Sequence, residues 1–167
     1  MSGDKDIKLL KERRSIRRYD SRPIEKEILD QIFEITSWCW SAVNRQPWKF
    51  YVIRNKELIS KVAKECTTGT FAAEAPVLVA LIGDIEAQPH WFLQDMCFVS
   101  LQMALAAWAF GVGTCFIGNI NKEKVGELLG LKENDYLLTI LPLGYPLGDI
   151  PKARPRKSLN EIVNYFD

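Results

Sequence analysis

Residues 91–110 have the sequence WFLQDMCFVSLQMALAAWAF, and this pattern predicts a helix from about Trp91 to Phe110 that is apolar nearly all round. A helix on the surface of a monomer would keep one polar face. We therefore expect this helix to be buried, either in the centre of the domain or against a second subunit. Just before it, Pro76 opens the apolar run Val77–Ile82, which is the best candidate for a central buried strand.

Further strands and helices flank these two elements without regular alternation, which favours an α+β fold over a doubly wound sheet. The first helix should turn Ile7 and Leu10 inward, and the strand Trp48–Arg54 is apolar on both faces, hence interior to a covered sheet. The other expected elements are helices at Glu25–Trp38, around Leu58–Val62, after the cap Asn121 and after the capping box Ser158–Glu161, and strands at Thr114–Ile117 and Tyr136–Leu143.

Length and composition favour one domain over residues 1–167, because 47% of the chain is hydrophobic and two domains would each have a marginal core. The proline-rich stretch Gly148–Lys157 is typical of an extended arm. An arm needs a surface to lie on, and in so small a chain another subunit is one candidate.

The formal charge is +1, from 22 basic and 21 acidic residues, so we expect neither a nucleic-acid partner nor a membrane partner. Four cysteines without CxxC spacing and the single histidine, His90, make a zinc site improbable. No apolar signal core follows the first residues. We expect a soluble protein of the reducing cytoplasm.

Two clusters of basic residues lie near the two ends of the chain. The first is Arg13–Arg18, with Ser15 inside it, and the second is Arg154–Lys157. A guanidinium group is a planar fork that fits two phosphate oxygens at once. The simpler explanation is that both clusters are solvated, since cations near a helix end are mildly favourable. A fold that joined the two ends would instead make a pocket for a dianionic phosphate.

The segment Ser41–Trp48, with the sequence SAVNRQPW, has side chains suited to a heterocycle. The carboxamides of Asn44 and Gln46 and the hydroxyl of Ser41 could pair with the pyrimidine edge of a flavin. The alternative is a loop whose polar side chains bond to their own backbone.

No other motif supplies chemistry. Gly111-Val-Gly113 follows a helix, and the next glycine, Gly118, has the wrong spacing for a dinucleotide fingerprint. No P-loop, HExxH motif or Ser/His/Asp set is present, so any catalysis has to come from a cofactor. The aromatic clusters Trp38–Trp40 and His90–Phe92 either pack in a core or interface, or roof a flavin and shape a substrate pocket.

Six motifs in this order resemble the nitroreductase family, and together they cover nearly the whole chain. They are Arg13–Arg17, Ser41–Trp48, Ala75-Pro76 before a strand, Gly111–Gly118, Leu143–Pro146 and Pro155-Arg156. The resemblance implies a three-layer α+β fold, with a central mixed β-sheet flanked by helices. It also implies a homodimer with exchanged C-terminal arms and flavin mononucleotide (FMN) bound at the subunit interface.

Position by position, the resemblance implies which residues bind FMN, with no metal ligand and with the chemistry at flavin atom N5. The turn Arg13–Arg17 matches residues on the phosphate, the ribityl chain and the N1/O2 edge, where Arg17 would stabilise the reduced anionic flavin. Ser41–Gln46 matches residues on the flavin or the partner's flavin, and Ile117–Gly118 matches backbone near N5 and O4. The implied cofactor-binding residues are Arg13, Arg14, Ser15, Arg17, Ser41, Asn44, Gln46, Ile117, Gly118, Arg154 and Arg156.

The resemblance implies an oxidoreductase in which NADH or NADPH passes hydride to flavin N5 and an electron-poor small molecule, such as a nitroaromatic or a quinone, is then reduced. Trp40 and Phe116 depart from residues common in the family, and the short stretch Thr67–Ala75 leaves little room for the lids that help set substrate choice. The acceptor therefore stays open. Two alternatives remain: a non-catalytic flavin-binding or carrier module, and specialised flavin chemistry such as reductive dehalogenation or flavin fragmentation.

Overall fold

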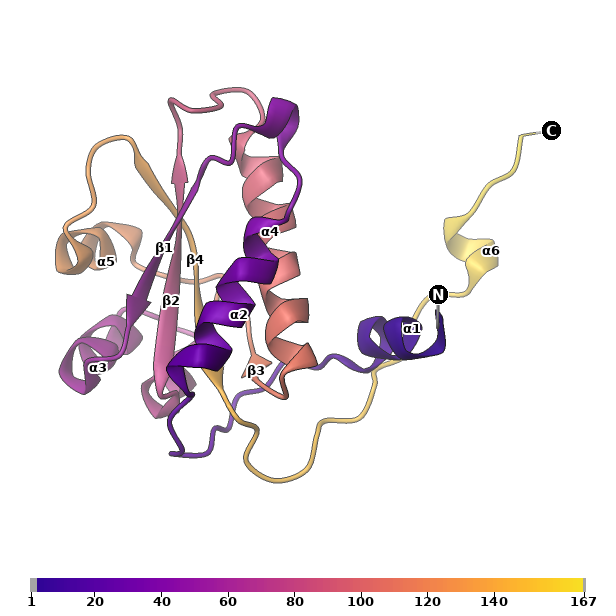
Figure 1. Ribbon diagram of the computed structural model, residues 1–167, viewed down its shortest axis with the longest axis horizontal. Coiled ribbons are helices and arrows are strands. Elements are labelled where there is room, and N and C mark those ends of the chain that lie inside the picture. The colour runs from indigo at the N-terminus through magenta and orange to yellow at the C-terminus, as the bar shows by residue number, and fades with distance from the viewer. Residues whose placement is uncertain (1–2, 167) are drawn as a thin grey trace.

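A four-stranded sheet in the order β1-β2-β4-β3 forms the centre of the computed structural model, which describes residues 3–166 (Figure 1). The strands are β1 (Trp48–Ile53), β2 (Val77–Asp84), β3 (Gly113–Thr114) and β4 (Asp135–Gly144). All three strand pairs are antiparallel within this part of the chain. The prediction of a mixed sheet is therefore wrong here, since the sole parallel contact is the isolated bridge between Ser15 and Thr114.

Helices cover both faces of the sheet, so the fold is α+β with three layers, as predicted (Figure 1). On one face lie α2 (Lys26–Ser37) and α4 (Phe92–Ala109); on the other lie α3 (Lys56–Lys64) and α5 (Lys122–Leu129). The remaining elements are α1 (Gly3–Glu12), the short helices η1 (Ala42–Asn44) and η2 (Thr70–Glu74), and α6 (Leu159–Ile162).

Strand β2 is the buried centre of the sheet, which confirms the prediction for the run that follows Pro76. Its side chains alternate between the two faces, as a pleated strand requires. Leu78 and Ile82 pack on the side of α3 and α5, while Val79 and Leu81 pack on the side of α2 and α4.

Strand β1 was expected in the interior of the sheet, and that prediction is wrong. Among residues 3–166 it pairs only with β2 and forms an edge, where Val52 is 42% exposed. The first helix also differs from the expectation, because Ile7 and Leu10 are 49% and 63% exposed rather than turned inward. Both sets of apolar side chains lack cover from the described part of this chain.

Helix α4 is buried on one side only. Met96, Val99 and Met103 pack into the core with α2 and the sheet. On the opposite side Phe98 and Leu101 are 42% and 51% exposed. By length and composition α4 could also cross a membrane, a test that core helices of soluble proteins pass as well. The apolar outer face of α4 remains available to a second subunit.

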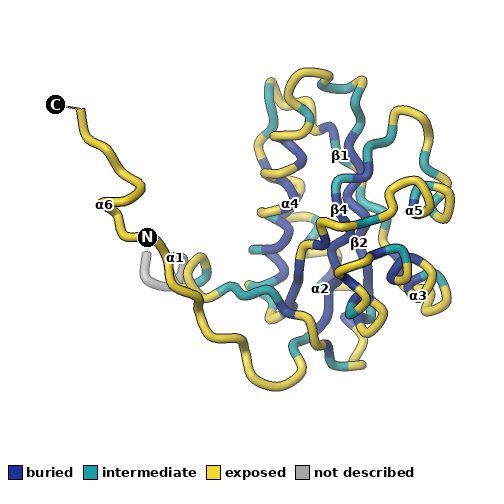
Figure 2. The backbone as a smooth tube through the Cα atoms, turned by 180° about the vertical axis from the view of Figure 1, so that it is seen from behind, coloured by how far each residue is buried: buried dark blue, intermediate teal, exposed yellow. Residues whose placement is uncertain are grey.

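The C-terminal arm leaves the body of the fold after β4 (Figure 2). Every residue from Leu147 to Phe166 is exposed, although the arm carries apolar side chains. The capping box at its end is confirmed, because Ser158 N donates to the Glu161 carboxylate at 2.8 Å and α6 begins there. The predicted extended arm thus exists; it begins with a hydrogen bond from Leu147 N to Arg18 O at 3.0 Å and stays exposed along its described length.

Candidate functional site

The two arginine clusters lie together around one cavity of about 310 Å³, although they come from opposite ends of the chain. Six of its eight lining residues are basic and none is acidic. No ion pair among residues 3–166 engages any of these basic side chains. Such a cavity attracts an anion with more than one charge. The lining residues are Arg13, Arg14, Ser15, Arg17, Pro151, Lys152, Arg154 and Arg156.

The turn that carries the first cluster is fixed to strand β3, which follows α4. Ile16 N donates to Thr114 O at 2.9 Å, and Ser15 forms an isolated parallel β-bridge with Thr114. Ile16 lies so close to Gly113 that a Cβ atom on that glycine would meet it at 2.5 Å. Only glycine therefore permits this approach. The flanking basic side chains project from a backbone that cannot shift freely.

Arg14 provides a direct test of whether the cavity fits a phosphate. Its Nη1 atom donates to Lys11 O at 2.7 Å and to Arg13 O at 2.9 Å, which closes the carboxyl end of α1. Its Nε atom is buried without a hydrogen-bond partner in the described structure. A buried donor left unpaired costs about 1–3 kcal/mol. An anionic oxygen would satisfy it, so the donor set fits a phosphate group.

Arg17 and Ser15 connect this cavity to a second one, of about 200 Å³, which Pro146, Leu147 and Pro151 also line. The guanidinium of Arg17 lies 5.9 Å from the ring centre of Phe71. Burial raises the pKa of the neighbouring Cys115 thiol, and the positive charge of Arg17 opposes that rise. The larger charged cavity thus continues into a less charged one.

Ile117 and Gly118 follow soon after Thr114 and present two different surfaces. The Ile117 carbonyl accepts from Thr139 Oγ1 at 2.8 Å, and its side chain is 2% exposed. Gly118 is exposed, and a Cβ atom there would meet no atom within 4 Å. Ile117 is therefore fixed in the core, while the backbone at Gly118 is open to a planar group; neither residue lines the two cavities described above.

The three predicted residues of the Ser41–Gln46 loop lie elsewhere in this chain. Ala42 N donates to the carboxylate of Asp95, in the first turn of α4, whereas the arginine turn bonds beyond the last turn (Figure 1). From Asp95 to Ala109 the helix spans about 20 Å at 1.5 Å per residue. One chain therefore does not bring this loop to its own arginine cavity.

The conformation of this loop is unusual. Val43, Asn44 and Gln46 have left-handed backbone angles, with φ of 46°, 57° and 50°. Such angles are strained, most of all for a β-branched residue like Val43. Ser41 Oγ accepts from Gln46 N at 2.9 Å, and Gln46 Nε2 donates to Asn44 Oδ1 at 3.2 Å. The loop braces itself, while both carboxamide side chains stay exposed.

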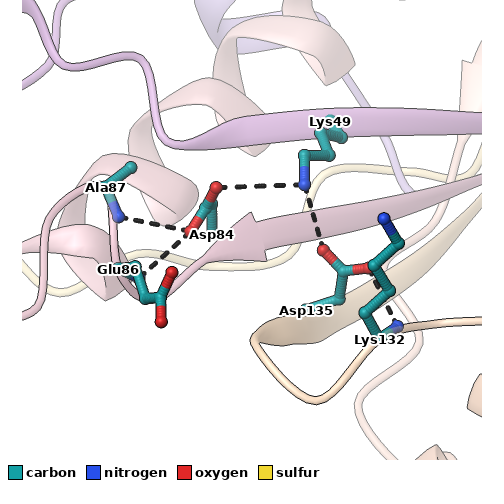
Figure 3. Close-up of polar contacts among 6 residues, drawn as sticks. All are labelled: Lys49, Asp84, Glu86, Ala87, Lys132 and Asp135. Atoms are coloured by element: carbon teal, nitrogen blue, oxygen red, sulfur yellow. Dashed lines mark hydrogen bonds and ion pairs between the residues drawn. The ribbon is translucent and has the colours of Figure 1, made fainter.

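Beyond the loop, an ion cluster fixes the start of β1 (Figure 3). Lys49 Nζ lies 3.1 Å from Asp135 Oδ1 and 3.9 Å from Asp84 Oδ2. Asp84 also accepts from two backbone amides of the turn that follows it. Nearby, Asp84 N donates to Pro47 O at 2.8 Å. This cluster ties the sheet to the residue next to the loop.

Three site elements were missed by sequence reasoning. Lys152 lines the charged cavity, and its place in the basic, proline-rich arm could have suggested it. Asp95 is the sole charged residue of helix α4, a pattern visible in the sequence. Phe71, whose ring centre lies 5.9 Å from the Arg17 guanidinium, belongs to no sequence pattern that could have suggested it. Another cavity, of about 400 Å³, mixes Arg54 and Lys56 with Glu74 and includes none of the predicted residues.

Comparison with known proteins gives a family match over most of the chain. The sequence model described as the Nitroreductase family matches residues 10–69 and 64–145. A protein of Methanothermobacter thermautotrophicus, provisionally named NADH dehydrogenase/NAD(P)H nitroreductase, is 32% identical over 146 residues, which cover 84% of this chain and 76% of that protein.

Two further similarities extend over longer stretches. The iodotyrosine deiodinase of Hydra vulgaris is 26% identical over 192 residues, covering 93% of this chain and 70% of that protein. The crystal structure of a provisionally named nitroreductase from Exiguobacterium sibiricum, in complex with FMN, is 26% identical with a TM-score of 0.87. That alignment covers 95% of this chain and 96% of the other.

Proposed function

The chain belongs to the nitroreductase family, and from this premise we propose that it is an FMN-dependent oxidoreductase that uses NADH or NADPH. The electron acceptor in this proposal is a small electron-poor molecule, such as a nitroaromatic or a quinone. The charged cavity of Arg13, Arg154 and their neighbours is the observation that carries it. A phosphate bearing two negative charges matches that cavity in charge and in donor chemistry.

The residues of this chain would hold FMN and tune it. Arg13, Arg154 and Arg156 would bind the phosphate, and the unpaired Nε of Arg14 would donate to it. Arg17 would place a positive charge beside the ring, which favours added negative charge there. When bound, FMN would supply the hydride and electron transfer that the side chains themselves cannot provide.

The proposed active unit is a homodimer with exchanged C-terminal arms. Phe98 and Leu101 would be covered where the outer faces of two α4 helices meet, and the exposed arm would gain a surface. In that assembly Asn44 and Gln46 of one copy would contact the flavin held by the arginine cavity of the other. This arrangement accounts for the separation of the two groups along α4.

We place the enzyme in the cytoplasm, with no nucleic-acid or membrane partner. The near-zero net charge supports the lack of such partners, because it offers no general attraction to polyanions. The free thiols of Cys39, Cys66, Cys97 and Cys115 are compatible with a reducing compartment.

Reductive dehalogenation is the second candidate, and the similarity to the Hydra vulgaris iodotyrosine deiodinase favours it. Both candidates need the same cofactor site and differ in the acceptor. A non-catalytic flavin carrier would need the site as well, but would not oxidise NADH or NADPH.

The test begins with the purified protein. We expect it to be yellow and to release a flavin with one phosphate on denaturation. Oxidation of NADH and NADPH is then measured with a quinone, a nitroaromatic, a halogenated phenol, or no acceptor. A colourless protein that also fails to bind added FMN would refute the proposal. A yellow protein that oxidises neither NADH nor NADPH, with or without an acceptor, would instead support a non-catalytic flavin carrier.

A further inference from the structure

We propose that Asp95 is a positioning residue: it holds the Ser41–Gln46 loop in the shape that presents Asn44 and Gln46 to the flavin of the partner subunit. The inference rests on the proposed function and goes beyond it by giving a role to a residue outside the cofactor site. Asp95 itself would touch neither FMN nor substrate.

The burial of Asp95 is the first observation. Its side chain is 0% exposed, and both carboxylate oxygens face one donor, Ala42 N, at 3.1 and 3.2 Å. Within residues 3–166 no other group donates a hydrogen bond to the Asp95 carboxylate. A carboxylate has room for about four donors, and an underpaired buried charge is costly. The amino end of α4 offsets part of that cost.

The charge of Asp95 is felt in the turn that leads into the loop. Burial raises the pKa of the Cys39 thiol, and the negative charge of Asp95 raises it further. A second side chain of α4 also reaches this region, since Gln102 Nε2 donates to Ile35 O at 2.7 Å. Helix α4 therefore fixes both the end of α2 and the first residue of η1.

The backbone strain of the Ser41–Gln46 loop explains why it needs an anchor such as Asp95. Left-handed residues persist only where the surrounding structure enforces them. Ala42, which Asp95 holds, directly precedes Val43 and Asn44, two of the three such residues. Gln46 N is held separately by Ser41 Oγ. Without the Asp95 contact, only the backbone bonds from Asn44 N to Ser41 O and from Arg45 N to Ala42 O would oppose relaxation of the strained segment, and the exposed carboxamides would then lose their fixed direction.

The loop bonds at the opposite end of α4 from the arginine cavity of its own chain. Asp95 therefore acts on the ring side of a flavin held by another copy, and not on the phosphate side. This makes its effect distinguishable from that of an arginine. A change at Asp95 should weaken FMN and riboflavin alike, because both have the same ring.

The test compares Asp95→Leu, which keeps the branching at Cγ with a larger side chain but removes the acceptor, with Asp95→Asn, which keeps one acceptor oxygen. We expect Asp95→Leu to weaken both FMN and riboflavin by about tenfold, the usual effect of one hydrogen bond. The absorption bands of the bound flavin should also shift. Asp95→Asn should stay within about twofold of the wild type and keep its bands.

Ala42→Pro tests the same contact from the donor side, in case Asp95→Leu does not fold. The preceding residue, Ser41, has φ −145° and ψ 158°, a conformation that a following proline tolerates. The same loss of FMN and riboflavin affinity is expected. If the double variant folds, its loss should be less than the product of the two single losses, because both changes remove one contact.

Wild-type FMN binding is measured first, so that two failures can be told apart. A wild type that binds no flavin would overturn the proposed function, and this inference with it. A wild type that binds FMN, together with Asp95→Leu and Ala42→Pro variants of unchanged affinity and bands, would overturn the inference alone. Weakening of FMN without riboflavin would also overturn it, since that result points to the phosphate.

Discussion

Two groups of candidate site residues lie near opposite ends of α4. Only one of the two groups encloses a cavity within the described residues of a single chain. Beyond the carboxyl end of α4, the turn at Arg13–Arg17 and the arm at Pro151–Arg156 enclose a cavity of about 310 Å³. At its amino end, Asn44 and Gln46 are exposed and bond to each other. A single chain thus provides the groups for a phosphate, while its carboxamides lie near the opposite end of α4.

Strain differs between the two regions as well. The arginine turn is fixed by ordinary backbone bonds and by the close approach of Ile16 to Gly113. The loop instead has three left-handed residues without glycine. Strained conformations of this kind gather at functional sites. We propose that the loop is shaped for a contact outside its own chain, which the predictions below test.

The largest expected effect follows from breaking the proposed dimer. Leu101 is 51% exposed on α4, so Leu101→Lys is tolerable in a monomer but would bury a charge in a dimer. An unpaired buried charge costs on the order of several kcal/mol. Sedimentation should show a monomer, and FMN and riboflavin affinity should both fall by about a hundredfold or more.

The matched control for this prediction is Leu128→Lys. Leu128 is 37% exposed on α5, on the opposite face of the sheet. This variant should remain a dimer and keep its flavin. If the Leu101→Lys monomer retained tight FMN binding, the loop would have no role in a second subunit's site.

The next effect isolates the arginine cavity. Arg13→Ala or Arg156→Ala should each weaken FMN by about tenfold to a hundredfold, since a charge-assisted contact contributes about 1.5–3 kcal/mol. Riboflavin, which lacks the phosphate, should be nearly unaffected. The double variant should lose less binding free energy than the sum of the two single losses, because both residues act on one ligand group. Equal weakening of riboflavin in a calorimetric titration would place these residues elsewhere.

The sequence predicted most of the fold because its strongest patterns are local. The buried run after Pro76 became the central strand β2, and Asn121 and Gly130 delimit α5 as expected. The edge position of β1 could not be predicted, since an apolar strand looks the same whether its neighbour belongs to the same chain or to none. The exposure of Ile7 and Leu10 was missed for the same reason.

For the site, residue types and basic clusters pointed to a phosphate, but their arrangement in space did not follow from the sequence. Spacing could not show that Ser41–Gln46 lies at the far end of α4 from the arginines. Nor could it show that Asp95 holds Ala42, because a helix pattern ranks an isolated acid as a solvated residue. Long-range packing decides both facts.

A smaller effect concerns the loop, and it also tests which chain the loop serves. Asn44→Ala should weaken FMN and riboflavin equally, by about tenfold, since one hydrogen bond contributes about 1–1.5 kcal/mol. Mixed dimers of Asn44→Ala and Arg156→Ala subunits should then contain one intact site and one doubly impaired site. Flavin titration should recover half a wild-type equivalent per subunit. Two singly impaired sites, one weakened as in Asn44→Ala and the other as in Arg156→Ala, would show that loop and arginines serve the same chain.

The smallest effect separates the loop from the ion cluster at the start of β1 (Figure 3). The backbone amide of Lys132, and then Lys49, hold the pKa of Asp135 below its ordinary value. Asp135→Asn keeps the acceptor but removes the charge. Because Lys49 is about half exposed, we expect a loss of about 1 kcal/mol or less at pH 7, or about 2–4 °C in Tm.

The pH dependence of this loss has a definite sign. A carboxyl with a lowered pKa in the folded state contributes stability above its unfolded pKa, about 3.9, and loses it as pH falls through the folded value. Thermal unfolding at saturating FMN should therefore separate wild type from Asp135→Asn between pH 5 and about 7, with the difference vanishing in stronger acid. Flavin affinity at pH 7 should not change. If Asp135→Asn weakened riboflavin as Asn44→Ala does, the cluster would belong to the positioning of the loop, and Asp95 would not be its particular anchor.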